Sequence, residues 1–303
     1  MIPGRRLRHA LLSVLILVIG ASGAVWLAAG EGRTDGKFTV RRDIPYVANA
    51  GPDQTLDLFL PDGASTRTGT GQAQPVAPLV VWIHGGGWRG GDKQSVEVDY
   101  LLSAGYAVAS LNYRLSGDAI FPAQIQDVNA ALGFLRDHAA EYHLDPGGFV
   151  VGGDSAGAHL AALAAFSANA QPDTFMTDPD VRIVAIVNFF GPMDLTVAAT
   201  LQNEPEDLVD LLGGTARAKP ELARAASPVS WIDAADPPVL TIHGDGDQVV
   251  PLSQSQVLDA ALVDAGVVHT LMVIPDAPHG GPAFETGEIR GAVIAFLSGA
   301  LKD

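Results

Sequence analysis

The sequence predicts an α/β protein in which a mostly parallel central sheet is flanked by helices. Short apolar runs, such as 79–83 and 239–243, alternate along the chain with segments that carry apolar residues at helical spacing, such as 253–265. This alternation favours a parallel sheet covered on both faces, with ligand sites at the carboxyl ends of its strands. A chain of 303 residues can bury a full core, and we assign residues 38–303 to one domain.

Each element has its own local signal. In the segment 55–60 leucine alternates with other residues, as in a half-exposed strand. In the segment 121–142 apolar residues recur at helical spacing, which predicts an amphipathic helix. The expected strands are 38–47, 55–60, 79–83, 106–111, 149–151, 181–190, 239–243 and 270–274, and the expected helices are 121–142, 158–166, 253–265 and 283–297.

Two segments interrupt this pattern. Residues 61–78 are rich in Gly, Ser, Thr and Pro, which predicts a surface loop. Residues 191–237 mix leucines with acids and small residues and follow the end of an expected strand. A long insertion at that end of the sheet would lie over the site as a lid, and an ordinary surface excursion is the alternative.

The composition excludes several kinds of function. The chain has no cysteine, so it forms no disulfide, thiolate zinc site or cysteine nucleophile. Its formal charge of −16 argues against nucleic acid as a partner. No histidine and carboxylate cluster has metal-site spacing, and no glycine-rich phosphate loop is present, so we expect neither a metal nor another cofactor.

The first thirty residues have the pattern of an export segment. Three arginines within residues 5–8 precede an apolar run over 10–29, and residues 28–30 are small enough for cleavage. The run is long for a signal peptide and just long enough to span a bilayer. Residues 1–30 are therefore expected to be a signal peptide or an N-terminal membrane anchor. Both interpretations place the domain outside the cytoplasm, secreted or anchored.

Residues 153–157, Gly-Asp-Ser-Ala-Gly, carry the first chemical signal. They follow an apolar strand and precede a helix rich in Ala and Leu, which is the context of a strained nucleophile turn. The flanking glycines remove Cβ atoms beside the turn, and the helix start favours developing negative charge. We expect Ser155 to be exposed as a nucleophile, with a plain glycine-rich turn as the alternative.

Two further strand ends carry matching residues. Residues 84–88 read His-Gly-Gly-Gly-Trp, and such glycines let backbone N–H groups point inward, as an oxyanion hole requires. The loops 243–251 and 275–281 each place an acid or a histidine just after a strand. Serine, then acid, then histidine is the order associated with the α/β-hydrolase sheet.

Together these motifs resemble those of α/β-hydrolase esterases that carry both HGGGW and GDSAG. The chain is similar to the hormone-sensitive-lipase-like carboxylesterases and, more closely, to the acetyl-xylan, feruloyl and related esterases. The resemblance runs from about residue 44 to the C-terminus and rests on residues 84–88, 112–114, 153–157, 243–251 and 279–280. It implies the α/β-hydrolase fold, with a lid-like insertion before the acid loop.

The resemblance also implies roles for single residues. Ser155 would be the nucleophile, His279 its general base, and Asp247 the acid that orients the histidine. The chemistry agrees, because a serine hydroxyl needs a base to accept its proton and an imidazole suits that task at neutral pH. Asp245, between two glycines, is interpreted instead as a turn residue whose side chain bonds its own backbone.

Backbone groups and one aromatic side chain complete the implied site. The N–H groups of Gly86, Gly87 and Ala156 would form the oxyanion hole, and Trp88 would help to shape the substrate pocket.

Other polar residues have structural interpretations. We expect His84 to brace the oxyanion loop, His159 to be a buried, hydrogen-bonded histidine, and His243 to steady its turn. Arg114 and Asp127 could form a buried ion pair.

The predicted function is that of an exported serine carboxylesterase that hydrolyses esters through an acyl-enzyme on Ser155. An arylformamidase-type amide hydrolase and a serine peptidase on the same fold are alternatives, and a non-catalytic binding protein is an alternative from another class. The expected partner is a small-molecule ester, with membrane contact only through residues 1–30 if they are not cleaved. The motifs do not identify the acyl or alcohol group.

Overall fold

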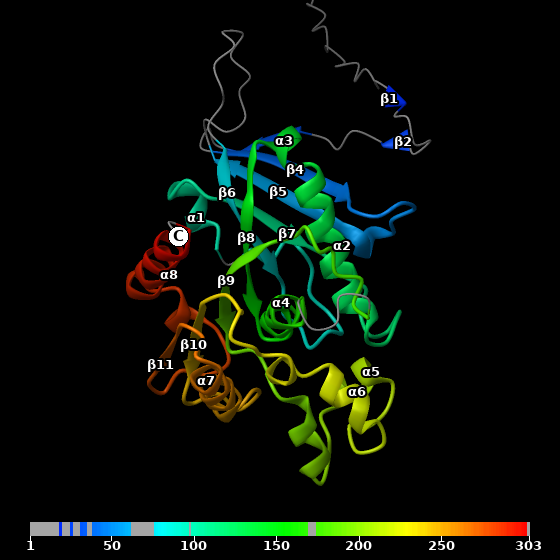
Figure 1. Cartoon of the computed structure of the whole chain (residues 1–303), viewed down its shortest axis with the longest axis vertical. Helices are drawn as coiled ribbons and strands as arrows, with labels where there is room; N and C mark the ends of the chain where they lie inside the picture. Colours follow the sequence, from blue (N-terminus) through cyan, green and yellow to red (C-terminus); the bar gives the residue numbers. More distant parts are fainter. Residues whose placement is uncertain are drawn as a thin grey trace, which may run out of the picture.

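A mixed β-sheet runs through the centre of the protein (Figure 1). The computed structural model describes residues 18–19, 25–26, 31–34, 38–61, 76–96, 98–168 and 174–301. Apart from the short strands β1 (Val18–Ile19) and β2 (Val25–Trp26), which pair with each other, the expected export segment lies outside the described residues. Most of the expected loop 61–78 also lies outside them.

The described strands of the large sheet follow the spatial order β11-β10-β9-β8-β6-β7-β5-β4-β3. From β11 to β7 all neighbours are parallel, whereas β5, β4 and β3 pair antiparallel at the other edge. The strand bounds are β3 Glu31–Thr34, β4 Phe38–Pro45, β5 Thr55–Pro61, β6 Ala77–Ile83, β7 Ala107–Leu111, β8 Leu144–Asp154, β9 Ile183–Phe189, β10 Val239–Gly244 and β11 His269–Ile274. The predicted mostly parallel sheet is confirmed.

Helices cover both faces of the sheet, in agreement with the mostly apolar inner strands. Alternate residues of β6 belong to different cores: Leu79 and Val81 face one layer, and Val80 and Trp82 face the other. The described α-helices are α1 Tyr100–Ser103, α2 Ala123–Asp137, α3 Ala139–Tyr142, α4 Ala156–Ser167, α5 Glu206–Leu212, α6 Pro220–Ala225, α7 Ser253–Ala265 and α8 Gly287–Ala300, with 3₁₀ turns at Pro52–Gln54, Leu195–Thr200, Pro228–Ser230 and Pro282–Phe284.

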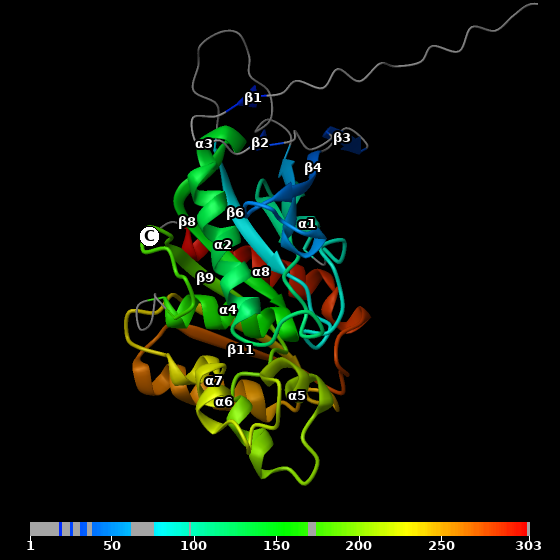
Figure 2. The same cartoon turned by 90° about the vertical axis from the view of Figure 1, so that its right-hand side faces the viewer.

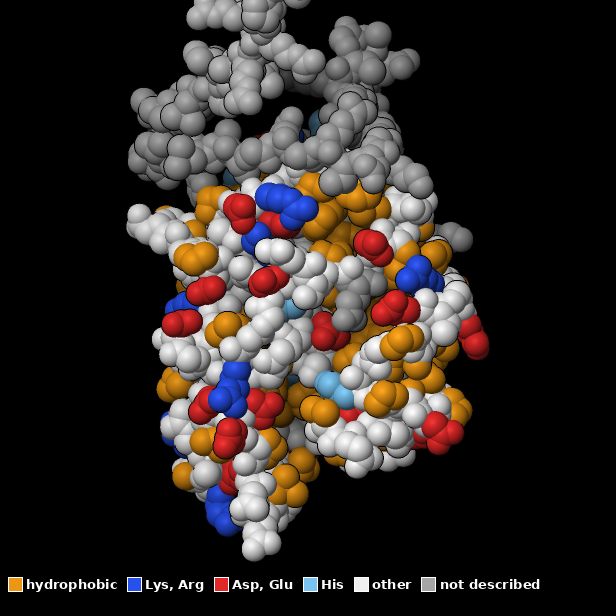
Figure 3. Space-filling model, turned by 180° about the vertical axis from the view of Figure 1, so that it is seen from behind, with side chains coloured by type: hydrophobic (Ala, Val, Ile, Leu, Met, Phe, Trp, Pro, Cys, Tyr) orange, Lys and Arg blue, Asp and Glu red, His pale blue; other side chains and the backbone are white. Residues whose placement is uncertain are grey.

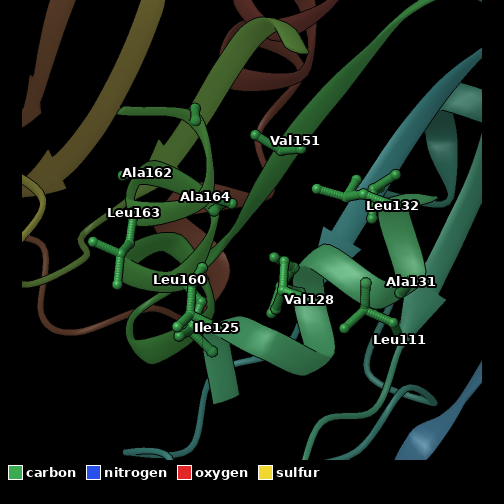
Figure 4. Close-up of a cluster of buried hydrophobic side chains, with 14 of the residues drawn as sticks. Leu111, Ile125, Val128, Ala131, Leu132, Val151, Leu160, Ala162, Leu163 and Ala164 are labelled. Carbon is green, nitrogen blue, oxygen red and sulfur yellow. The ribbon is translucent and has the colours of Figure 1, made fainter. Parts of the chain in front are cut away.

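The larger core joins α2 and α4 to one face of the sheet. Figure 4 shows Ile125 and Val128 of α2 beside Leu160 and Leu163 of α4, with Val151 of β8 nearby. All five side chains are fully buried. Burying a side chain of this size contributes about 1.5–3 kcal/mol. This packing fixes the start of α4, and with it Ser155, against the sheet.

The other layer is formed by α1 and α8. Leu101 of α1 and Val293 and Leu297 of α8 are buried in the second core. Figures 1 and 2 show α8 on the opposite side of the sheet from α2 and α4. The three-layer arrangement follows, because parallel strands leave both faces of a sheet apolar.

The expected single helix 121–142 is divided into α2 and α3 at His138. The backbone of His138 has a φ of −105°, and its ring Nδ1 lies 2.8 Å from the carbonyl oxygen of Phe134, which also accepts the His138 N–H. The side chain therefore competes for the carbonyl of the last helical turn. The prediction of one continuous helix was wrong at His138.

The insertion 191–237 forms a separate group of short helices beyond the sheet. Figure 2 shows α5 and α6 below α4, at the end of the molecule away from β4. Side-chain bonds tie its first residues to the domain: Gln254 Oε1 accepts the N–H groups of Met193 and Asp194 at 2.7 and 2.8 Å. Ser227 Oγ accepts the Leu195 N–H at 2.9 Å. Gln254 of α7 therefore holds the start of the insertion on the domain, and the Ser227 bond joins an early and a late part of the insertion to each other.

Candidate active site

Ser155 lies at the turn between β8 and α4. Its backbone has φ 50° and ψ −117°, which is strained for a residue with a side chain. A Cβ at Gly153 or Gly157 would collide with the carbonyl oxygen of Ile83, at the end of the neighbouring strand β6. The two glycines thus allow the turn to sit against β6, as the spacing predicted.

Three side chains from three loops form one chain of hydrogen bonds. His279 Nε2 lies 3.0 Å from Ser155 Oγ, and His279 Nδ1 lies 2.6 Å from Asp247 Oδ2. Ser155 follows β8, Asp247 follows β10, and His279 follows β11. Because these parallel strands end at the same edge of the sheet, residues far apart in the sequence meet there.

The carboxylate of Asp247 is held in one orientation. Its Oδ1 accepts the N–H groups of Val249 and Val250 at 2.8 and 2.9 Å, so Oδ2 faces His279. His243 Nε2 also lies 3.2 Å from Oδ2 and 2.9 Å from the Val250 carbonyl oxygen. Burial lowers the pKa of His243, which favours a neutral ring that steadies the loop.

Asp245 does not contact the histidine. Its Oδ1 accepts the N–H of Asp276 at 2.6 Å, so it joins the acid loop to the loop that carries His279. The expectation that it bonds its own backbone was wrong, because the two loops lie side by side and offer a nearer donor.

Three residues, whose backbone N–H groups are unpaired within the described part of the chain, line the same cavity as Ser155. Within the described ranges, the N–H groups of Gly86, Gly87 and Ala156 have no hydrogen-bond partner in the protein. Gly86 and Gly87 have φ of 106° and 59°, conformations that a residue with a Cβ adopts only with strain. Ala156 begins α4, where the first N–H groups lack partners within the helix. These groups are available to an anionic oxygen.

Neighbouring side chains hold the oxyanion loop, residues 84–88, in place. His84 is buried, stacks on Tyr113 at 4.5 Å between ring centroids, and its Nδ1 lies 2.8 Å from the Gly85 carbonyl oxygen. Asp154 Oδ1 accepts the Gly85 N–H at 3.0 Å. Burial raises the pKa of Asp154, and the Gly85 N–H opposes that shift by stabilising the carboxylate. His84 therefore has the bracing contacts expected of it.

His159 has contacts on both ring nitrogens. The Trp88 indole N–H lies 3.2 Å from His159 Nδ1, and His159 Nε2 lies 2.7 Å from the carbonyl oxygen of Ala226. Burial lowers the pKa of this histidine to about 4. The expectation of a buried, hydrogen-bonded histidine is confirmed.

A cavity of about 890 Å³ opens in front of Ser155. The insertion and α7 supply most of its apolar wall, with Leu195, Val197, Ala198, Leu201, Leu208 and Val257. The motifs alone did not identify these residues. Trp88 lines the same cavity, as expected. The insertion therefore covers the site. The sequence feature that indicated this cover was a leucine-rich segment after the carboxyl end of a strand.

Arg114 and Asp127 form the expected ion pair away from the cavity. Arg114 Nε and Nη2 donate to the two carboxylate oxygens of Asp127 at 2.7 and 2.8 Å. A second buried pair was not anticipated: Lys93 Nζ lies 2.6 Å from Asp57 Oδ1. Both acids are nearly fully buried, so the pairs hold the loops that follow β6 and β7 against β5 and α2.

No group of three or more histidine or acidic side chains in the described ranges is placed to hold a metal ion. Likewise, none of the helices among these residues combines the length and apolarity needed to cross a bilayer. On the face shown in Figure 3, acidic side chains outnumber basic ones, in keeping with the formal charge of −16.

The family model for BD-FAE matches residues 56–262, more than half of the chain. Among curated proteins, the esterase LipQ of Mycobacterium tuberculosis is 34% identical over 264 residues, which cover 84% of this chain and 59% of LipQ. The chain thus spans less than two thirds of that relative.

Solved structures share the fold. A truncated carbohydrate esterase from gut microbiota superposes with a TM-score of 0.77 and 27% identity, covering 90% of this chain and all of that one. A bifunctional GH43-CE protein of Bacteroides eggerthii gives 0.75 and 32%, covering 86% of this chain and 35% of that protein.

Proposed function

This chain belongs to the BD-FAE family of α/β-hydrolase esterases, and from that premise we propose that it hydrolyses carboxylic esters through an acyl-enzyme on Ser155. The observation that carries the proposal is the hydrogen-bond chain from Ser155 through His279 to Asp247. A serine with a base at 3.0 Å, oriented by a carboxylate at 2.6 Å, has the contacts of an activated nucleophile. The esterase names of its relatives agree with this reaction.

Acylation begins with attack of Ser155 Oγ on the ester carbonyl carbon. As the new C–O bond forms, His279 Nε2 takes the hydroxyl proton, and the carbonyl π electrons move to the oxygen. Asp247 stabilises the imidazolium through its bond to Nδ1. The tetrahedral intermediate then collapses, the alcohol oxygen takes the proton from His279, and the alcohol leaves.

The negative oxygen of that intermediate needs fixed donors. The N–H groups of Gly86, Gly87 and Ala156 line the cavity beside Ser155, and they are free to donate. One such donor is worth about 10²–10³ in kcat in a serine hydrolase. The start of α4 adds the positive end of the helix dipole.

Deacylation repeats the steps with water. His279 takes a proton from the water as its oxygen attacks the acyl carbon, and returns that proton to Ser155 Oγ as the acid leaves. The products are one carboxylic acid and one alcohol, and the enzyme regains its starting protonation.

Turnover of p-nitrophenyl acetate tests the proposal. Wild-type protein should release p-nitrophenol, and Ser155→Ala should lower kcat by several orders of magnitude while the far-UV circular dichroism is unchanged. Ser230→Ala, an exposed serine of the insertion, is the matched control and should keep full activity. If Ser155→Ala kept more than about a tenth of the rate, the nucleophile would be another group. Faster cleavage of an N-formyl anilide than of the ester would assign the enzyme to amide hydrolysis.

We further propose that residues 1–30 export the domain. The three arginines followed by the apolar run support this proposal. Fusion of residues 1–30 to an alkaline phosphatase that is active only outside the cytoplasm should give phosphatase activity. Replacement of Leu15 and Leu17 by arginine should abolish that activity. Equal activity of both fusions would contradict export through this segment.

A further inference from the structure

His159 occupies a central position that the reaction steps above do not use. It is fully buried on α4, one turn after Ser155, and its N–H donates to the Ser155 carbonyl oxygen at 3.0 Å. Its ring nitrogens contact two other segments, the oxyanion loop and the insertion.

The two ring contacts fix one tautomer. An indole nitrogen only donates, so His159 Nδ1 must accept from Trp88. The proton therefore lies on Nε2, which donates to the Ala226 carbonyl oxygen at 2.7 Å. Both nitrogens have partners in a fully buried ring, which is the condition for a rigid polar contact in an apolar surrounding.

Trp88 needs such an anchor. Its φ of 56° is an unfavourable conformation for a bulky side chain and costs about 1–3 kcal/mol. The indole is 4% exposed, and its ring meets the His159 ring edge-on at 5.1 Å between centroids. Because Trp88 directly follows Gly86 and Gly87, the position of the indole constrains the direction of their N–H groups.

The second contact reaches the insertion. Ala226 is buried immediately after α6, and the neighbouring Ala225 carbonyl oxygen accepts the Trp231 indole N–H at 2.9 Å. One imidazole therefore joins the helix of the nucleophile, the oxyanion loop and the base of the insertion.

We propose that His159 is a positioning residue that holds Trp88, and through it the N–H groups of Gly86 and Gly87, in the geometry that receives the oxyanion. The inference rests on the proposed ester hydrolysis. It predicts that loss of the imidazole acts on kcat rather than on substrate binding, since the oxyanion donors act mainly in the transition state.

Substitutions separate this role from plain packing. His159→Phe keeps a ring but removes both hydrogen bonds, and Trp88→Phe removes the indole donor. Each should lower kcat on p-nitrophenyl acetate about 10- to 100-fold, since small misplacements of reacting groups cost that much. His159 does not line the cavity, so His159→Phe should change KM less than about threefold. His159→Asn places an acceptor at the position of Nδ1, and it should recover kcat to within about fivefold of wild type.

A double-mutant cycle tests the coupling. The two residues act through one contact, so their effects should not multiply. The kcat of the His159→Phe/Trp88→Phe protein should be at most about threefold lower than the kcat of the slower single variant. Ser167→Ala is the control: this buried serine of α4 bonds the Leu163 carbonyl oxygen at 2.6 Å. Its loss should lower the Tm while kcat stays within about twofold of wild type.

The outcomes are distinguishable. If wild-type protein did not turn over esters, the proposed function would fail and this inference with it. If wild-type protein were active, two results would overturn this inference alone. One is a wild-type kcat in either phenylalanine variant, and the other is a double variant in which the two losses of kcat multiply. An asparagine variant as slow as His159→Phe would likewise show that the bond to Trp88 does not carry the effect.

Discussion

Replacing Asp247 with asparagine should nearly abolish activity and leave the protein folded. The side chain has two faces: Oδ1 accepts the N–H groups of Val249 and Val250, and Oδ2 faces His279. An asparagine has one acceptor and one donor face. If its NH₂ group faced the two valines, both N–H groups would lose their acceptor, at about 1–3 kcal/mol for the buried N–H of Val250. The amide oxygen therefore takes the Oδ1 position.

That orientation sets the histidine in the wrong tautomer. The amide NH₂ then donates to His279 Nδ1, so the ring proton moves to Nε2. A protonated Nε2 cannot accept the Ser155 proton at 3.0 Å. The corresponding change in another serine hydrolase lowers kcat about 10⁴-fold, or about 5.5 kcal/mol of transition-state stabilisation. We expect a loss of that order here.

The assay is steady-state hydrolysis of p-nitrophenyl acetate, with urea denaturation as the folding control. Asp245→Asn is the matched variant, because this exposed acid accepts only the Asp276 N–H. It should keep kcat within a few-fold of wild type and lose about 1 kcal/mol of stability. Retention of kcat by Asp247→Asn, or its loss in Asp245→Asn alone, would refute the assignment of the acid.

Three other properties follow from the structure. Burial raises the pKa of Asp236 to about 7, so the folded protein holds this proton more tightly than the unfolded chain. The free energy of unfolding should therefore fall as the pH rises from about 4 to 7. In urea titrations Asp236→Asn should make this fall smaller, and an unchanged dependence on pH would contradict the raised pKa. Arg114→Met leaves the buried carboxylate of Asp127 without its cation and should lower the free energy of unfolding by about 3 kcal/mol in urea denaturation. The ion pairs of Arg136 are more exposed, so Arg136→Met should cost about 1 kcal/mol or less, and equal losses would contradict this reasoning. The apolar wall of the cavity should make kcat/KM rise about two- to fourfold per methylene from p-nitrophenyl acetate to butyrate, whereas a best rate on acetate would contradict burial of the acyl chain there.

The parts of the fold that depend on local pattern could be predicted from the sequence. Strand β10 was expected within one residue at its end, and α7 was expected with its observed bounds, because their apolar periodicity is strong. The division of α2 from α3 could not be predicted, since the apolar spacing continues through His138 and does not reveal the contact between its ring and the Phe134 carbonyl oxygen.

The site divides in the same way. The glycines around Ser155 have a steric cause in their approach to β6, so sequence spacing alone could indicate the turn. By contrast, the partner of Asp245 lies 31 residues away, and the cavity wall comes from the irregular insertion. Contacts of this kind arise from tertiary packing, which motif spacing does not encode.

The most direct test of the central claim is mass spectrometry after reaction with diethyl p-nitrophenyl phosphate. This reagent transfers a diethylphosphoryl group to an activated serine and releases p-nitrophenol. We predict one adduct per chain, on the peptide that contains Ser155, together with complete loss of ester hydrolysis. Ser155→Ala should take up no adduct. An adduct on a different residue, or full ester hydrolysis by a protein with Ser155 modified, would contradict an acyl-enzyme on Ser155.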